Sequence, residues 1–230
     1  MGGVFSRIIT PTYKKIIILG PNSVGKTSIF TVLTSYNTIK KTESWVNFFS
    51  LTKREAKPDR LLEMEDQDSD KEQTDILDRR PFKPVPSTIS FNHEKLNFQD
   101  KLFSLWELSN VIKDHWKCYY HSMEGVIIVL DAYELKYQQY EESLTFLRNV
   151  HKELLKHNEQ PSSSKIRTPT LIFLNKIDKS HQRKLKADLP EQLLLDKYFA
   201  NYKIQECSVI ERYTVLEGFN WLVSKIYPNT

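Results

Sequence analysis

The sequence has few glycines, few cysteines and no long hydrophobic run. Only 6 of its 230 residues are glycine, which is few for a protein built on loops. The two cysteines, Cys118 and Cys207, are far apart and have no histidine cluster beside them, so they indicate a reducing compartment rather than a disulfide framework or a zinc site. The longest apolar runs, Ile16–Leu19 and Val126–Leu130, are of strand length, and none approaches the roughly 18 residues of a membrane span. The first residues, MGGVFSRIITP, also lack the extended apolar region of a secretory signal.

Charged residues are nearly balanced in number but unevenly distributed. The formal net charge is +4 and the pI is near 8.8. This mild basicity alone does not discriminate between an anionic membrane surface and nucleic acid as a partner. We expect no nucleic-acid partner. Residues 53–80 carry seven Lys or Arg and ten Asp or Glu, with little apolar periodicity, so they cannot bury much surface. We predict a charged insertion at about residues 45–84, which is either a plain solvated loop or an acidic patch that docks a partner.

Apolar runs of strand length alternate with stretches of helical periodicity. We expect strands at residues 15–20, 89–98, 101–108, 125–132, 170–178 and 203–209. The second and third of these form a predicted hairpin around Gln99 and Asp100. We expect helices at residues 27–36, 140–157, 189–202 and 216–227. This alternation predicts an α/β fold with a mostly parallel sheet and helices on both faces, in one domain over residues 14–230 that follows an N-terminal segment at 1–13.

A phosphate-binding loop is indicated directly after the first strand. The sequence GPNSVGKT, Gly20 to Thr27, matches G-x-x-x-x-G-K-[ST] and opens a predicted helix, which is the context the motif requires. Backbone N–H groups of such a loop and the helix N-terminus bind a β-phosphate, the Lys26 ammonium reaches the β- and γ-phosphates, and the Thr27 hydroxyl ligates Mg²⁺. The loop residues that we expect to contact a nucleotide are Asn22, Ser23, Val24, Gly25, Lys26, Thr27 and Ser28.

A second motif indicates which base is bound. Asn175, Lys176, Ile177 and Asp178 close the predicted strand at 170–178, and the carboxyl ends of parallel strands are where such sheets bind ligands. A carboxylate at this place accepts hydrogen bonds from the N1–H and 2-amino groups of guanine, whereas adenine has neither group. Asn175, Lys176 and Asp178 are therefore predicted to bind guanine. A P-loop nucleotide kinase would also carry a phosphate loop, but this guanine-binding motif argues against that class of enzyme.

Several further stretches resemble the Arf and Arf-like GTPases of the Ras superfamily. PSTISFN, Pro86 to Asn92, is similar to the Pro-Thr-Ile-Gly-Phe-Asn segment of that family, and this resemblance implies that Thr88 ligates Mg²⁺ and contacts the γ-phosphate. ECSV, Glu206 to Val209, resembles the family's Cys-Ala-Thr loop, which implies guanine contacts from Cys207, Ser208 and Val209. WKCYYHSMEGVIIVLDA and VLEGFNWLVSKI are also close to family stretches. The resemblance covers most of residues 1–52 and 84–230 and implies a six-stranded small G-protein fold with GTP or GDP and Mg²⁺ as cofactors.

The sequence departs from this family where the hydrolytic residues are expected. The family's Trp-Asp-x-Gly-Gly-Gln is here Trp106-Glu107-Leu108-Ser109-Asn110-Val111. Glu107 stands for the aspartate that holds Mg²⁺ through a water, and Asn110 matches the glycine that contacts the γ-phosphate. The glutamine that orients the attacking water has no equivalent, since Val111 and Ile112, at and after its place, cannot hydrogen-bond water. His115 is either a substitute that positions the water or, as we expect, a surface histidine beside a tryptophan. Asn22 also replaces an aspartate of many members. We assign no catalytic residue beyond the candidate Glu107, and we expect GTP hydrolysis to be weak or absent, since complete small GTPases alone turn over at only about 10⁻⁴ per second.

The N-terminus carries a signal for membrane association. Gly2 followed by Ser6 matches the N-myristoylation pattern, and the apolar residues between positions 4 and 9 share one helical face. One acyl chain gives marginal binding, to which this face and nearby basic residues add. We therefore expect acylation at Gly2 and a peripheral position on the cytosolic face of an endomembrane or ciliary membrane. The alternative is a frayed terminus with an accidental Gly-Gly start.

Two functions remain open from the sequence. The first is an atypical Arf-like switch that recruits effector proteins at a membrane when GTP is bound. The second is a GTP-loaded, non-switching structural subunit of a larger protein assembly. Thr88 and Gly2 favour the switch, whereas the altered segment at 106–111 favours the structural subunit.

Overall fold

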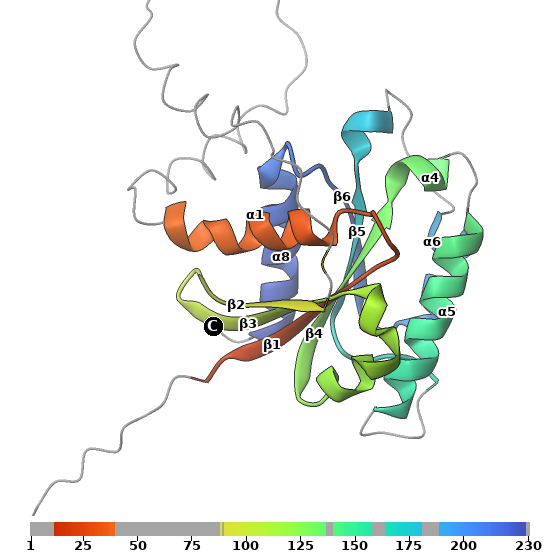
Figure 1. The fold of residues 1–230 in the computed structure, drawn as a ribbon, viewed down its shortest axis with the longest axis horizontal. Helices are drawn as coiled ribbons and strands as arrows, with labels where there is room; N and C mark the ends of the chain where they lie inside the picture. Colours follow the sequence, from red (N-terminus) through yellow and green to blue (C-terminus); the bar gives the residue numbers. More distant parts are fainter. Residues whose placement is uncertain are drawn as a thin grey trace, which may run out of the picture.

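The computed structural model describes residues 12–39, 88, 90–136, 140–157, 164–180 and 189–228. Residues 1–11 of the predicted N-terminal segment, including Gly2, lie outside the described residues, as does the predicted insertion at 45–84. The described residues form one six-stranded sheet in the order β2-β3-β1-β4-β5-β6, with helices on both of its faces (Figure 1). The predicted fold class is thereby confirmed.

The strands correspond to the apolar runs of the sequence. They are β1 (Lys14–Leu19), β2 (Phe91–Phe98), β3 (Lys101–Leu108), β4 (Met123–Asp131), β5 (Thr170–Asn175) and β6 (Tyr202–Glu206). All neighbours pair in parallel except β2 and β3. Gln99 and Asp100 join these two strands with φ angles of 51° and 61°, as a two-residue hairpin turn requires. The predicted hairpin is therefore confirmed.

The two faces of the sheet are covered by different helices. α1 (Lys26–Ile39) and α8 (Arg212–Ile226) lie on one face, and α4 (Ala132–Lys136), α5 (Tyr140–Lys156), α6 (Leu189–Gln192) and α7 (Leu195–Tyr198) lie on the other (Figure 1). The central strands are apolar throughout because successive residues face alternate layers: Ile16 and Ile18 pack with α1 and α8, whereas Ile17 and Leu19 pack with the other helices. None of the helices among the described residues has the length and apolarity to cross a membrane.

Four regions differ from the secondary structure predicted from the sequence. The single helix predicted at 189–202 is wrong: it is divided into α6 and α7 by Leu194, which has a left-handed φ of 55°. This break lets both Leu193 and Leu195 be fully buried while Leu194 stays 40% exposed. A 3₁₀ helix η1 (Asn110–Tyr119), the short helix α4 and a 3₁₀ turn η2 (Ile177–Ser180) were not predicted, because such short elements leave no clear periodicity.

Candidate nucleotide-binding site

The phosphate-loop motif forms the connection between β1 and α1. Gly25 has a φ of 94°, and a Cβ atom there would lie 2.3 Å from Asn175 Nδ2, so only glycine fits. The Asn175 amide donates to the carbonyl of Val24 at 2.9 Å. The two predicted nucleotide motifs, which are 151 residues apart at this contact, therefore meet directly.

The ammonium of Lys26 is turned toward the inside of this loop. Only 8% of the residue is exposed, and Nζ donates to the carbonyls of Gly20 at 3.0 Å and Pro21 at 2.6 Å. Burial lowers the pKa of Lys26 from its ordinary value to about 8, and the negative charge of Glu107 opposes this shift. A bound phosphate would supply the anionic partner that the buried ammonium needs, so the loop is chemically suited to a phosphate ligand.

Oxygen ligands gather beside the start of α1. The Thr27 hydroxyl donates to Glu107 Oε1 at 2.5 Å and lies 2.9 Å from the Thr88 hydroxyl, although Thr27 and Thr88 are 61 positions apart. Asn92 donates from Nδ2 to the other carboxylate oxygen, Glu107 Oε2, at 2.6 Å. These hydroxyls and the carboxylate line a cavity of about 590 Å³ together with Lys26. Among the described residues no cluster of three or more His, Cys, Asp or Glu is placed to hold a metal, but hydroxyls with one carboxylate are the hard oxygen donors that Mg²⁺ takes when phosphates complete its shell.

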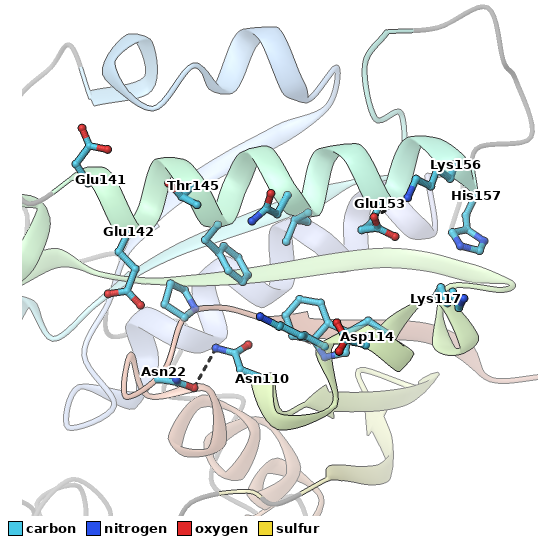
Figure 2. Close-up of a pocket in the computed structure, with 16 residues that line it drawn as sticks. Asn22, Asn110, Asp114, Lys117, Glu141, Glu142, Thr145, Glu153, Lys156 and His157 are labelled. Carbon is cyan, nitrogen blue, oxygen red and sulfur yellow. Dashed lines mark hydrogen bonds and ion pairs between the residues drawn. The ribbon is translucent and has the colours of Figure 1, made fainter.

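The altered segment after Glu107 folds into η1, in which two 3₁₀ stretches meet at a kink at Ile112, where φ is −103° and ψ is 22°. The Ser109 hydroxyl accepts from the Val111 N–H and caps η1, while the indole of buried Trp116 donates to the Ser109 carbonyl at 2.9 Å. The Asn110 amide donates to Asn22 Oδ1 at 3.0 Å, which joins η1 to the phosphate loop (Figure 2). The Val111 side chain, at the place of the water-orienting glutamine, is 75% exposed.

A second hollow lies next to this junction. It has a volume of about 990 Å³ and runs between η1 and α5 (Figure 2). Its walls carry charges of both signs, such as Lys117 and Glu142, over the rings of Trp116 and Phe146. It shares Asn22 and Asn110 with the smaller cavity.

The predicted base-binding residues lie where β5 and β6 end. Ser208 is buried and donates from Oγ to Asp178 Oδ1 at 2.7 Å. Lys176, with a φ of 70°, pairs with Asp131 Oδ2 at 2.5 Å. Cys207 is fully buried, and burial raises the pKa of its thiol, so that it stays protonated. Val209 is partly buried against the core under α8. The predicted residues are thus brought together, and their contacts with a nucleotide stay predictions.

Two site residues were missed in the sequence. Asp131 is the last residue of β4 and lies beside the base motif. Its carboxylate pairs with the Lys176 ammonium and also accepts a hydrogen bond from the Tyr133 N–H. Asn92 faces Glu107 across the β2–β3 ladder. The second contact was detectable, because a two-residue turn at Gln99 and Asp100 fixes the pairing of the strands and places these two residues opposite each other.

The sheet order, the phosphate loop and the base motif define a small-GTPase-type P-loop fold. The family model described as the ADP-ribosylation factor family matches residues 74–226, and the chain therefore belongs to this family. Membership implies guanine-nucleotide binding. The matched part begins after the phosphate loop, whose assignment depends on its own sequence and geometry.

Individual relatives agree with this placement. The chain is 26% identical over 141 residues to ADP-ribosylation factor-like protein 1 of Saccharomyces cerevisiae, over 60% of this chain and 71% of that protein. It is 28% identical over 148 residues to ADP-ribosylation factor-like protein 2 of Arabidopsis thaliana, over 62% and 72% of the two chains. Its fold is similar to that of the Arl6 BBS3 small GTPase of Trypanosoma brucei, solved with the bound nucleotide analogue GppNp, with a TM-score of 0.60, 18% identity, and coverage of 95% of this chain and 100% of the other.

Proposed function

We propose that this Arf-like small GTPase is an atypical membrane-associated switch, which recruits effector proteins when GTP is bound and hydrolyses GTP weakly or not at all. The observation that carries the weak hydrolysis is Val111: an apolar side chain, 75% exposed, occupies the place of the water-orienting glutamine. It has no group that accepts a proton from water or orients it by hydrogen bonding.

Each remaining part of the nucleotide site has a role that its geometry supports. Lys26 binds the β- and γ-phosphates, and Asp178, held by Ser208, accepts from the guanine base. Thr27 and Thr88 would hold Mg²⁺, which, when bound, neutralises charge on the β- and γ-phosphates. Thr88 contacts Thr27 at the proposed metal site, which places it where it would respond to the γ-phosphate.

An exposed aromatic surface supports effector recruitment. The rings of Phe91, Trp106 and Tyr119 lie 5.4 to 5.7 Å apart on β2, β3 and η1, and Phe91 is 41% exposed. Aromatic side chains grouped in this way are typical of protein-binding surfaces. The aromatic cluster includes residues of β3, which carries Glu107, and of η1. A shift of either element when the nucleotide changes would therefore move the aromatic rings.

A second candidate is the GTP-loaded structural subunit of a larger protein assembly. The observation that favours it is the anchoring of η1 by the Trp116 indole and by the Asn22–Asn110 bond, both of which are contacts within the protein itself. A segment held in this way does not need a γ-phosphate to be ordered, which suits a bound nucleotide that acts as a brace.

Nucleotide identity, turnover and exchange, measured on the purified full-length chain, test these functions. We expect one guanine nucleotide per chain by chromatography of the released nucleotide, and single-turnover hydrolysis below about 10⁻⁴ per second. Chelation of Mg²⁺ should release the nucleotide if the protein is a switch. GTP that stays bound for hours after chelation would overturn the switch in favour of the structural subunit, and hydrolysis well above that rate would overturn the role given to Val111. Lys26→Ala should abolish binding, whereas Lys225→Ala, an exposed lysine on α8, should not.

Membrane association needs a separate measurement. The full-length chain, produced with an N-myristoyltransferase, should float with vesicles that contain anionic lipid. Gly2→Ala removes the acyl acceptor and should leave the chain in the aqueous fraction, while Gly3→Ala serves as the matched control. Equal flotation of the wild type and Gly2→Ala would overturn the acyl anchor and the placement on an endomembrane or ciliary surface.

A further inference from the structure

Three side-chain oxygens form a small triangle next to the phosphate loop. Thr27 Oγ1 lies 2.9 Å from Thr88 Oγ1 and 2.5 Å from Glu107 Oε1, and the third side, between Thr88 Oγ1 and Glu107 Oε1, is 3.4 Å. The mean of these sides is about 2.9 Å. Neighbouring ligands of an octahedral Mg²⁺, with bonds of 2.0–2.1 Å, are also separated by ~2.9 Å. The three oxygens are therefore close enough together to ligate one ion, and their individual separations of 2.5, 2.9 and 3.4 Å bracket this value.

The Glu107 carboxylate needs a cation at this place. Glu107 is 0% exposed. Its hydrogen bonds come from the hydroxyls of Thr27 and Thr88 and from the amide of Asn92, all of which are neutral groups. Among the described residues no ion pair includes Glu107, and the nearby Lys26 ammonium hydrogen-bonds the carbonyls of Gly20 and Pro21 instead. The Lys26 ammonium acts on Glu107 only through space and not by a hydrogen bond. A buried carboxylate whose hydrogen bonds all come from neutral groups is costly to keep charged, and a divalent ion beside Oε1 would reduce that cost.

The other oxygen of the carboxylate is held from the opposite strand. Asn92 Nδ2 donates to Oε2 at 2.6 Å, and it also lies 3.3 Å from the Thr88 hydroxyl. Asn92 and Glu107 are directly opposed in the β2–β3 register, so the strand pairing itself fixes their approach. With Oε2 occupied in this way, Oε1 is the oxygen that faces both threonines.

We propose that Glu107 is a direct ligand of the divalent cation through Oε1, and that Asn92 is the residue that positions it. A shorter aspartate at 107 would lack one methylene of reach and would contact the cation through a water, as the family resemblance implies for its own aspartate. The inference rests on the proposed Mg²⁺–nucleotide site and adds a third protein oxygen to it. With a β- and a γ-phosphate oxygen, the three protein oxygens leave one of six positions for water.

The number of water ligands is measurable without any turnover. Mn²⁺ replaces Mg²⁺ in the full-length chain loaded with a non-hydrolysable GTP analogue, and the broadening of the Mn²⁺ EPR signal in ¹⁷O-labelled water counts the bound waters. We expect about one water in the wild type and about two in Glu107→Asp, in which a water replaces the direct carboxylate contact. About two waters in the wild type would overturn the direct contact, whatever the variants do.

Asn92 is tested by metal affinity with a matched control. Asn92→Ala releases Oε2 and should weaken Mn²⁺ binding about tenfold, the effect of one lost hydrogen bond to a charged group. Asn97→Ala, an exposed asparagine on the same strand, should leave Mn²⁺ affinity unchanged, which separates positioning from general weakening of β2. Equal Mn²⁺ affinities for wild type and Asn92→Ala would overturn the positioning role.

The outcomes also separate this inference from the proposed function. A wild-type chain that binds neither guanine nucleotide nor Mn²⁺ would overturn both. A chain that binds both but carries two waters on the metal would leave the nucleotide switch intact and overturn only the direct role of Glu107.

Discussion

Nucleotide affinity should fall when the pH is raised above neutrality, because the phosphate loop depends on a lysine with a lowered pKa. Burial lowers the pKa of Lys26 to about 8. A bound polyphosphate favours the charged ammonium and raises that pKa, so binding takes up a proton whenever Lys26 is partly deprotonated. The sign is fixed: affinity is constant well below pH 8 and decreases above it.

The magnitude follows from the protonated fraction of Lys26. With a pKa of about 8, about 90% of the chains carry the charge at pH 7.0 and about a quarter carry it at pH 8.5. If only the charged form binds, the Kd for GTP rises about fourfold between these two pH values. The uptake should be about 0.1 proton per nucleotide at pH 7.0 and about 0.5 at pH 8.0.

Titration calorimetry at fixed free Mg²⁺ measures both quantities. Repeating the titration in two buffers of different ionisation enthalpy gives the number of protons taken up. Lys26→Arg keeps its charge over this range, so its affinity should be independent of pH whatever its absolute value. A wild-type Kd that is the same at pH 7.0 and 8.5, with no proton uptake at pH 8.0, would refute the lowered pKa as the determinant of binding.

Three further changes test other parts of the site. Asp178→Asn should favour xanthine over guanine nucleotides in a competition assay, since the reversed hydrogen-bonding pattern suits xanthine; an unchanged preference would mean that the base is bound elsewhere. Gly25→Ala should lower the thermal midpoint of the nucleotide-free chain, because a left-handed backbone costs about 1–2 kcal/mol for a non-glycine residue and the new Cβ would displace the Asn175 amide; an unchanged midpoint would contradict this. Trp116→Phe removes the hydrogen bond to the Ser109 carbonyl, worth about 1 kcal/mol, and should speed hydrogen exchange across η1, whereas equal exchange rates would show that the bond does not anchor it.

The sequence predicted the fold well because its strands are buried on both faces. Three strands, β1, β4 and β5, contain continuous apolar runs. The chain alternates between such runs and helical periodicity, which leaves few alternatives to a parallel sheet. The break at Leu194 was not predictable in this way. Both neighbouring leucines are compatible with a helix, and only the shape of the core decides that both point inward.

The site was predictable where it depends on motifs and not where it depends on tertiary contacts. The phosphate loop and the motif at the end of β5 were predicted from short patterns of fixed spacing, and the residues after β6 from the family resemblance. The contact between Asn175 and Val24, the pairing of Lys176 with Asp131 and the position of η1 join distant parts of the chain. No local pattern encodes them, since they depend on how strands are ordered in the sheet.

Two departures from the family resemblance turn out to be one feature of the structure. Asn22 and Asn110 were predicted as separate changes, one in the phosphate loop and one after Glu107, yet their side chains hydrogen-bond to each other at 3.0 Å. A glycine at 110 has no side chain to donate, so this tie between η1 and the loop exists only because residue 110 has changed. It is a direct side-chain link between the two segments. We therefore expect the anchored η1 to respond little to whether GTP or GDP is bound. In the proposed switch, the responding residue would be Thr88, whose contacts with Thr27, Asn92 and Glu107 all lie at the proposed metal site.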